Sequence, residues 1–360
     1  MVEGNLEAAA RAALDPHVWH YISRGSGDNV SVDEATDAWR QYRFRPRVLQ
    51  DVRHVDTGLE LFGHWRTPIG IAPSAFHQLY TPRGELATAA AALACGAPMV
   101  LSSRTTTRLE DVAAALGGPW WFQVYVMREP SITAATVRRA RDAGASALVL
   151  TGDTPYVGYV PPTGTARPLP LTDELALVNV AEHLPDRDID DIWDLIDQDA
   201  GITTDTIAWL VQESGLPVIV KGVLRGDEAI RCVEAGASGI WVSNHGGRQL
   251  DGAVPTAHAL PEVVAAVDGQ VPVVVDGGIR SGTDALAALA LGASAVFLGR
   301  PVIWGLADDA AAGAAQVVTQ VADQLRHAMG LAGATRLADL DPSLVFGTPT
   351  FGSGSTLRSS

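Results

Sequence analysis

Eight short apolar runs rich in β-branched residues recur along the chain, and this repeat constrains the fold more than any other feature. The runs lie at residues 68–72, 98–101, 121–125, 147–151, 217–221, 239–243, 272–276 and 295–299. Short runs that are apolar throughout are typical of strands covered on both faces. We therefore predict eight buried strands.

Most of these runs are followed by a segment rich in Ala, Leu, Val and Glu, which we predict to be a helix. The helical segments are residues 84–95, 132–143, 226–235, 257–267 and 283–291. Gly144, Gly236 and Gly292 follow three of them, where glycine commonly ends a helix. Repeated strand–helix units predict a closed (β/α)8 barrel or an open doubly wound sheet. The even count and the absence of an early Gly-x-Gly-x-x-Gly fingerprint favour the barrel.

Two segments fall outside the repeat of what we predict to be a single domain spanning residues 1–360. Residues 1–66 form a leader with a helical start, and residues 155–202 form a long insertion after the fourth strand. An insertion at that end of a barrel strand is expected to act as a lid. Its acidic run, residues 186–199, is interpreted as a solvated amphipathic helix rather than a charged binding surface. Its inward residues would be Ile189, Ile192, Leu195 and Ile196.

Composition and charge exclude several classes of protein. Apolar residues make up 47% of the 360 residues, enough for a large core, and the net charge is −15. That charge argues against nucleic acid and anionic membrane surfaces as partners. No apolar run approaches the ~18 residues of a membrane span, and the N-terminus lacks the pattern of a signal peptide.

The two cysteines, Cys95 and Cys232, form no CxxC pair. We therefore expect no metal site and no disulfide framework, but free buried thiols in a reducing cytoplasm.

Polar residues or glycines follow every predicted strand. Barrel enzymes carry their active sites at these strand ends. The residues there are Ser74, Ser102, Ser103, Gln123, Tyr125, Thr151, Asp153, Lys221, Ser243, Asn244, His245, Arg248, Asp276, Gly277, Gly278, Arg280, Gly299 and Arg300. A barrel that served only as a scaffold would not need polar residues at the end of every strand, so we predict an active site.

The loops after the seventh and eighth strands carry the signal for a phosphate site. They read Asp276-Gly-Gly-Ile-Arg280 and Gly299-Arg300. Glycines let backbone N–H groups approach a phosphate, and arginine supplies paired donors. Barrels commonly bind phosphate at these two loops.

Lys221 closes an apolar strand, where a charge is costly without an anionic partner. It could form a Schiff base, hold an electron-rich cofactor ring, or pair with a carboxylate of the barrel. Gln123 and Thr151 are suited to hydrogen-bonding a planar heterocycle.

His245 is the predicted catalytic base. It lies past a strand end between Asn244 and two glycines, three residues before Arg248. Asp153, at the end of the fourth strand, could hold the imidazole and stabilise its protonated form. Arg248 could pair with a substrate carboxylate.

These residues resemble the FMN-dependent α-hydroxy-acid oxidases and dehydrogenases, such as glycolate oxidase, lactate oxidase and mandelate dehydrogenase. The resemblance covers nearly the whole chain, and its most specific stretch runs from Ser243 to Asp251. It is carried further by Tyr21, Phe44–Arg47, Ile71–Ala75, Leu101–Ser103, Phe122–Tyr125, Thr151–Pro155, Val220–Val223, Asp276–Arg280 and Gly299–Pro301.

The resemblance implies an FMN enzyme that oxidises the α-carbon of a 2-hydroxy acid to a 2-oxo acid. FMN would contact Ala72, Pro73, Ser74, Ala75, Ser102, Gln123, Thr151, Lys221, Ser243, Asp276, Gly277, Gly278, Arg280, Gly299 and Arg300. His245 would take the proton with Asp153 behind it, and Lys221 would stabilise negative charge on the reduced flavin. Tyr21, Tyr125 and Arg248 would bind the substrate. The family also implies a homo-tetramer, and the absence of a haem-binding or quinone-docking segment favours O2 as the acceptor.

The sequence departs from the family pattern after the fourth strand. Members that act on simple 2-hydroxy acids usually carry Gly-Arg-Arg there, and the second arginine clamps the carboxylate. Here the stretch reads Gly158-Tyr159-Val160. Arg104 and Arg167 are the candidates to replace this arginine; alternatively, the substrate is not a small free hydroxy acid, as in specialised metabolism.

Two other functions stay open from the sequence. The same flavin site could oxidise an amine or carry out an oxidative decarboxylation, with His245 still the base. A flavin-binding protein without turnover is the non-enzyme alternative.

Overall fold

Eight parallel strands form a closed barrel in the computed structural model, which describes residues 2–161, 169–184 and 189–346. The strands are β4 (Ile69–Ile71), β5 (Val100–Leu101), β6 (Trp120–Val124), β7 (Ala145–Thr151), β8 (Val218–Val223), β9 (Gly239–Val242), β10 (Val273–Val275) and β11 (Ala295–Leu298). They are hydrogen-bonded in the order β4-β11-β10-β9-β8-β7-β6-β5. A parallel bridge between Ile71 and Met99 joins the two ends of that order. The predicted (β/α)8 barrel is therefore confirmed, and the open sheet is wrong.

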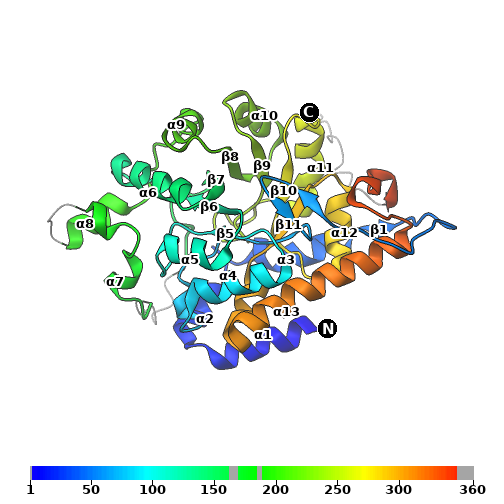
Figure 1. Ribbon diagram of the computed structural model, residues 1–360, viewed down its shortest axis with the longest axis horizontal. Helices are drawn as coiled ribbons and strands as arrows, with labels where there is room; N and C mark the ends of the chain where they lie inside the picture. The colour runs from blue at the N-terminus through cyan, green and yellow to red at the C-terminus, as the bar shows by residue number, and fades with distance from the viewer. Residues whose placement is uncertain (1, 162–168, 185–188, 347–360) are drawn as a thin grey trace, which may run out of the picture.

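Helices surround the barrel, as Figure 1 shows. The repeat comprises α4 (Gly84–Cys95), α5 (Leu109–Leu116), α6 (Pro130–Asp142), α9 (Asp205–Ser214), α10 (Gly226–Glu234), α11 (Thr256–Val267), α12 (Gly282–Ala290) and α13 (Arg300–Ala332). Gly144, Gly236 and Gly292 have positive φ just past the ends of α6, α10 and α12, so the predicted helix ends are confirmed. Helix α13 is interrupted by non-helical backbone at Asp309 and Ala310.

Alternate residues of each strand fill the inside of the barrel. The interior cluster includes Val100, Trp121, Ala147, Val149, Ile219, Trp241, Val274, Ala295 and Phe297. Trp241 packs against Phe297 with ring centroids 4.2 Å apart. Gly70 makes room for this packing, because a Cβ there would meet the Phe297 ring at 2.4 Å. The strands are thus anchored below the polar ends that carry the site.

The leader wraps around the barrel and pairs with the C-terminal part of the chain. It contains α1 (Val2–Ala13), α2 (Pro16–Ser23), α3 (Val30–Arg40), β1 (Arg43–Phe44) and the β2–β3 hairpin (Leu59–Glu60, His64–Trp65). Strand β1 pairs antiparallel with β12 (Val345–Phe346), which follows the 3-10 turns η3 (Leu337–Asp339) and η4 (Pro342–Leu344). Helix α1 lies along α13 (Figure 1).

The insertion after β7 contains α7 (Asp173–Ala176), η2 (Ala181–His183) and α8 (Ile189–Ile196). Ile196 is buried against Met127 and Ile132, and Ile192 and Leu195 pack on the same cluster. The interpretation of an amphipathic helix is confirmed for these three residues, whereas the side chain of Ile189 lies outside the described residues. Figure 1 shows α7 and α8 beside α5 and α6.

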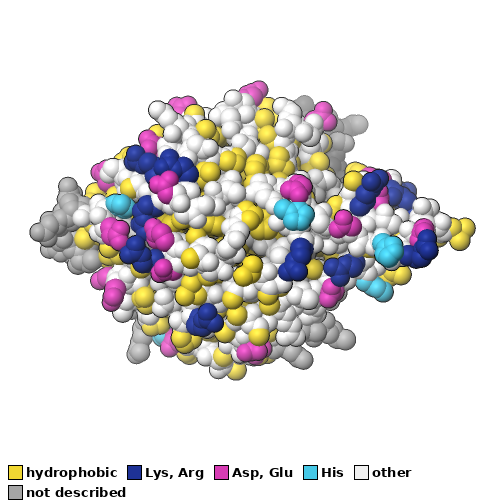
Figure 2. All heavy atoms as spheres, viewed as in Figure 1, with side chains coloured by type: hydrophobic (Ala, Val, Ile, Leu, Met, Phe, Trp, Pro, Cys, Tyr) yellow, Lys and Arg dark blue, Asp and Glu magenta, His cyan; other side chains and the backbone are white. Residues whose placement is uncertain are grey.

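Three further features concern the composition and the surface. No helix within the described residues is long and apolar enough to cross a bilayer. Cys232 is a buried free thiol, and Cys95 is free and half-buried. On the face shown in Figure 2, basic side chains are scattered among acidic ones.

Candidate active site

A pocket of about 950 Å3, counting the open solvent at its mouth, lies at the carboxyl ends of the barrel strands. The inward-facing residues of the strands continue, at the carboxyl ends, into this cavity. Trp121 and Gln123 point inward on β6, Val149 and Thr151 on β7, and Ile219 and Lys221 on β8. The apolar residue of each pair packs in the barrel, and the polar residue above it lines the cavity.

Nearly all the predicted site residues line this one cavity. They are Tyr21, Ala72, Pro73, Ser74, Ala75, Ser102, Gln123, Tyr125, Thr151, Lys221, His245, Arg248, Asp276, Gly277, Gly278, Arg280, Gly299 and Arg300. Asp153 and Ser243 do not line it, but stand behind His245 and Lys221 respectively.

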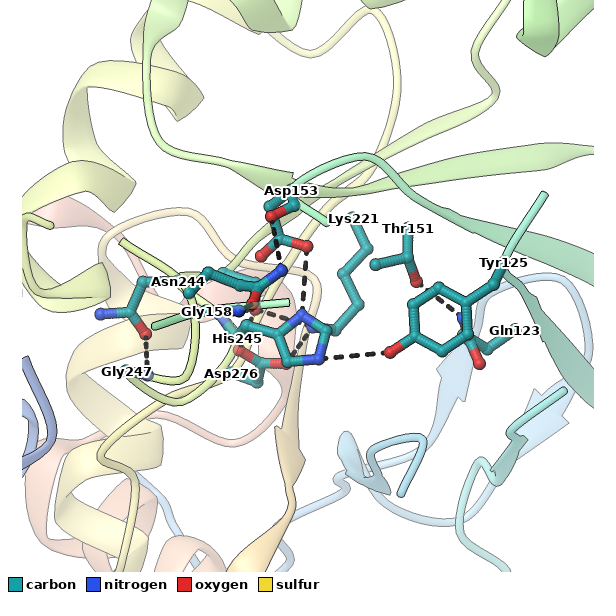
Figure 3. A network of polar contacts seen from close by, with 12 residues as sticks. Gln123, Tyr125, Thr151, Asp153, Gly158, Lys221, Asn244, His245, Gly247 and Asp276 are labelled. Carbon is teal, nitrogen blue, oxygen red and sulfur yellow. Dashed lines mark hydrogen bonds and ion pairs between the residues drawn. The ribbon is translucent and has the colours of Figure 1, made fainter. Parts of the chain in front are cut away.

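His245 lies between a carboxylate and a phenol, as Figure 3 shows. Its Nδ1 is 3.1 Å from Oδ1 of Asp153, and its Nε2 is 3.4 Å from the hydroxyl of Tyr125. The backbone of His245 has φ 57°, in the left-handed region that non-glycine residues seldom occupy. Such conformations persist where the surroundings fix them and cluster at functional sites. One fixing contact is the hydrogen bond from its backbone N–H to the hydroxyl of Ser243, at 3.1 Å.

Asp153 stays charged although only 14% of its side chain is exposed. Burial is the largest influence on its pKa and raises it, but His245 and Lys221 outweigh burial, and the pKa lies below its ordinary value. Its second oxygen, Oδ2, has no hydrogen-bond partner among the described residues. The charge of Asp153 therefore acts mainly on the imidazole ring of His245, which it also orients.

Lys221 forms a buried network across three strands. Its ammonium donates to the Ser243 hydroxyl at 2.8 Å and lies 3.3 Å from Oδ2 of Asp276. Ser243 in turn donates to Oδ1 of Asp276 at 2.6 Å. The predicted alternative of an ion pair with a barrel carboxylate is therefore present. Because Lys221 also lines the cavity, the same ammonium faces any ring bound there.

The amide of Gln123 is held in one orientation. Its Oε1 accepts from the Ser102 hydroxyl at 3.1 Å and from the Ser103 backbone at 3.2 Å. Its Nε2 donates to the Thr151 hydroxyl at 2.9 Å. The Thr151 hydroxyl keeps its own proton for an acceptor, and the row of polar groups suits the edge of a heterocycle.

The loops after β10 and β11 fit a phosphate group. Gly277 and Gly278 have φ of 88° and 77°, which turns the backbone away from extended geometry. A Cβ at Gly299 would meet nothing within 4 Å, so there is open space above it. Among the described residues, the N–H groups of Gly278 and Gly299 have no hydrogen-bond acceptor. Helix α13 starts at Arg300 and adds the favourable end of its dipole.

Arg300 also connects the leader to the loop of His245. Its guanidinium donates to the carbonyls of Ile22, Arg24 and Gly246 at 3.0, 3.1 and 2.8 Å. Burial, followed by repulsion from Arg248 and Arg280, lowers the pKa of Arg300 to about 9. A group of mutually repelling arginines at one end of the cavity favours an anion there.

Arg248 and Tyr21 lie together at the leader side of the cavity. The guanidinium sits 4.8 Å from the centre of the Tyr21 ring and donates to the Tyr21 carbonyl at 2.6 Å. Burial, with a smaller contribution from the Asp153 charge, raises the pKa of Tyr125, so its hydroxyl keeps its proton and can donate. The three residues predicted to bind substrate are brought together.

Two further residues of the stretch from Ser243 to Asp251 hold loops in place. Asp251 accepts hydrogen bonds from the backbone N–H groups of Asp28, Val30 and Ser31, at the start of α3. Gln249 binds the Asp153 carbonyl at 2.9 Å and accepts from the N–H of Gly158. These two residues position the leader and the loop after β7 around His245.

Sequence reasoning missed several cavity residues. Ile22, Tyr80, Ile279 and Phe297 also line the cavity. Ile22, Ile279 and Phe297 are apolar and gave no signal of chemistry, although Ile22 and Ile279 adjoin predicted residues. Tyr80 carries a hydroxyl, but it does not follow a predicted strand directly.

The structure describes only one of the two arginines considered as replacements for the missing arginine. Arg104 is half-buried and donates to the Ile196 carbonyl at 2.7 Å. Arg167 lies outside the described residues. The Tyr159 carbonyl beside Val160 accepts from the N–H of Gly27, which ties this loop to the leader.

Comparison with known proteins points to one family. A model of the family described as FMN-dependent dehydrogenase matches residues 10–346. The chain is 40% identical to an L-lactate oxidase of Nostoc sp. over 94% of this chain and 96% of the relative. It is 41% identical to a 4-hydroxymandelate oxidase of Amycolatopsis orientalis, covering 91% and 93%. A peroxisomal (S)-2-hydroxy-acid oxidase of Oryza sativa subsp. japonica is 40% identical, covering 93% of each.

Solved structures agree with the sequence relatives. Mandelate oxidase with (S)-4-hydroxymandelic acid superposes with a TM-score of 0.86 at 39% identity, covering 95% of this chain and 97% of that one. An arginine-to-leucine variant of mandelate oxidase with 2-hydroxy-phenylacetamide gives 0.84 at 39% identity, with the same coverage.

Proposed function

The chain belongs to the FMN-dependent dehydrogenase family, and we propose how its site carries out the oxidation of a 2-hydroxy acid to a 2-oxo acid. FMN is the cofactor. One observation carries the proposal: the imidazole of His245, backed by Asp153, faces a cavity that also holds Lys221, Arg248 and the glycine loops.

The residues of the cavity suit FMN at both ends. The phosphate would be held by the N–H groups of Gly278 and Gly299, with Arg280 and Arg300 beside them. The ring would lie against Ala72–Ala75, with Ser102, Gln123 and Thr151 along its edge and Lys221 at its most electron-rich side. Bound FMN supplies the acceptor for the two electrons that leave the substrate α-carbon.

His245 would take the proton in this reaction. The oxidation removes two electrons and two protons, one from the α-carbon and one from its hydroxyl. Nε2 of His245 would accept one of these protons, with Asp153 stabilising the resulting imidazolium, and the second proton would leave with the two electrons to the bound flavin. Tyr125, 3.4 Å from Nε2, would hydrogen-bond the substrate oxygen next to that carbon. Arg248 and Tyr21 would hold the α-carboxylate on the opposite side of the cavity.

Further statements about the enzyme rest on the relatives and the sequence. The relatives named as oxidases support O2 as the electron acceptor. A homo-oligomer, a cytoplasmic location, a single domain over residues 1–360 and a lid formed by residues 155–202 stay predictions from the sequence.

Anaerobic reduction of the bound flavin tests the proposed function. Purified protein should be yellow and should bleach when mixed with a 2-hydroxy acid, with one 2-oxo acid formed per flavin reduced. The matching α-amino acids, offered in parallel, should leave the flavin oxidised. Bleaching by amino acids alone, or a protein that takes up no FMN, would overturn the proposal.

A further inference from the structure

We propose that Arg104 binds an anionic group on the side chain of the substrate, so that the preferred 2-hydroxy acid carries a second negative charge. This inference rests on the proposed function, because it assigns the second end of the same substrate. Arg248 would hold the α-carboxylate and Arg104 the remote anionic group.

The backbone places Arg104 two residues after Ser102, next to the lining of the cavity. Its N–H donates to the hydroxyl of Ser102 at 3.1 Å, and Ser102 lines the cavity. Its carbonyl accepts from the N–H of Phe76 at 3.0 Å, and the Phe76 ring lies 6.5 Å from the ring of Tyr21. Arg104 therefore follows directly on the polar end of β5, one residue past Ser103.

The side chain of Arg104 reaches the insertion after β7. Its Nη2 donates to the carbonyl of Ile196, at the end of α8. The segment after Ile196 runs beside the continuation of β6, where the N–H of Arg128 binds the Asp197 carbonyl at 2.9 Å. The guanidinium is thus held at the insertion, close enough to Tyr125 for each group to shift the pKa of the other.

The Arg104 guanidinium forms no ion pair within the described residues. No described carboxylate lies within 4 Å of it, and Asp197 is instead paired with Arg128 at 2.9 Å. Burial lowers the pKa of Arg104, with Tyr125, Asp197 and Tyr21 opposing this. A half-buried cation without a counter-ion is unfavourable, and an anionic ligand would relieve that cost.

The two arginines are held by different parts of the chain. Arg248 donates to carbonyls of the leader, at Tyr21 and Arg24, whereas Arg104 donates to the insertion. Both guanidiniums act on the hydroxyl of Tyr125 and lower its pKa. Two cations separated in this way suit two anionic groups of one molecule better than two contacts with one carboxylate.

Two substrates of equal chain length test the proposal. The holoenzyme is mixed anaerobically with (S)-2-hydroxyglutarate, whose side chain ends in a carboxylate, and with (S)-2-hydroxypentanoate, whose side chain ends in a methyl group. We expect kcat/KM for flavin reduction to favour hydroxyglutarate by about 10–100-fold, the effect of one charged hydrogen bond. In Arg104→Met this ratio should fall to about 1, mainly through the loss of the hydroxyglutarate rate, and Arg104→Lys should keep part of it.

A matched control and a binding measurement separate this role from a structural one. Arg108, in the same loop, pairs with Glu182 at 3.0 Å, and Arg108→Met should keep the full ratio. Glutarate, which has no hydroxyl to oxidise, should perturb the flavin spectrum of the parent with a Kd about 10–100-fold lower than in Arg104→Met.

The outcomes are distinct. A parent enzyme that prefers hydroxypentanoate, or an Arg104→Met enzyme that loses both substrates equally, overturns the proposal, because Arg104 then serves the α-carboxylate or the fold. A parent that binds FMN yet is reduced by neither acid points instead to a failure of the proposed function.

Discussion

Nδ1 of His245 lies 3.1 Å from Oδ1 of Asp153, which leaves Nε2 pointing into the cavity beside the Tyr125 hydroxyl. The two residues come from different strand ends, after β9 and β7, and Gln249 holds their loops together through the Asp153 carbonyl. A base oriented in this way needs no rearrangement to take a proton from a molecule above it.

Replacing Asp153 by Asn should slow the reaction without loss of cofactor. Asn keeps the shape of the side chain but removes the charge that stabilises the imidazolium. We expect the rate of anaerobic flavin reduction to fall by about 10²–10⁴-fold, with the FMN content unchanged. Stopped-flow absorbance measures the rate. An Asp153→Asn enzyme as fast as the parent would show that the carboxylate only packs against the ring.

The same carboxylate predicts a pH dependence of stability. The pKa of Asp153 is below its ordinary value of 3.8, so the unfolded chain binds its proton more readily than the folded chain does. Its stabilising contribution is therefore complete above that ordinary pKa and is lost as the pH falls through the folded pKa. The difference in Tm between the parent and Asp153→Asn should be largest near neutral pH and shrink below about pH 4. A difference that grows on acidification contradicts this assignment.

The Lys221–Asp276 pair should show strong coupling. Lys221→Met leaves the buried Asp276 charge without its partner, which typically costs about 3–5 kcal/mol. Adding Asp276→Asn removes that stranded charge, so the double variant should be less destabilised than the sum of the single variants. Urea unfolding of the four proteins measures this coupling. Simple additivity would mean that the two groups do not interact in solution.

Asp251 should stabilise the leader rather than the chemistry. Its carboxylate accepts hydrogen bonds from three backbone N–H groups at the start of α3. Asp251→Ala should lower the Tm and speed limited proteolysis near residues 25–31, because the first turn of α3 loses its cap. The Kd for FMN of the folded protein should stay close to that of the parent. Unchanged proteolysis would show that other contacts hold the leader.

The barrel could be predicted from the sequence because its signal is local and repeated. Each strand is a short apolar run, and Gly144, Gly236 and Gly292 mark helix ends at the expected places. The polar residues at the strand ends face the inside of the barrel, as do the apolar residues before them. They therefore line one common cavity. Local sequence patterns were therefore sufficient to predict both the barrel and the common cavity at its strand ends.

Contacts between distant segments could not be predicted in this way. Asp251 binds residues more than 200 positions earlier, and Arg300 binds the carbonyls of Ile22 and Arg24. The pairing of β1 with β12 joins the leader to the C-terminal part. The ion pair of Lys221 with Asp276 crosses the barrel interior past β9. Each depends on the closed barrel, which no single segment encodes.

Flavin reduction by the His245→Ala holoenzyme tests the central claim most directly. The parent, His245→Ala and a control variant, His327→Ala on the exposed face of α13, are loaded with FMN and mixed anaerobically with a 2-hydroxy acid carrying hydrogen or deuterium at the α-carbon. The account predicts equal FMN content in all three. It also predicts a slower reduction of the parent and the control by the deuterated acid, and a fall of about 10²–10⁴-fold in His245→Ala. A His245→Ala enzyme that is reduced as fast as the parent would contradict it.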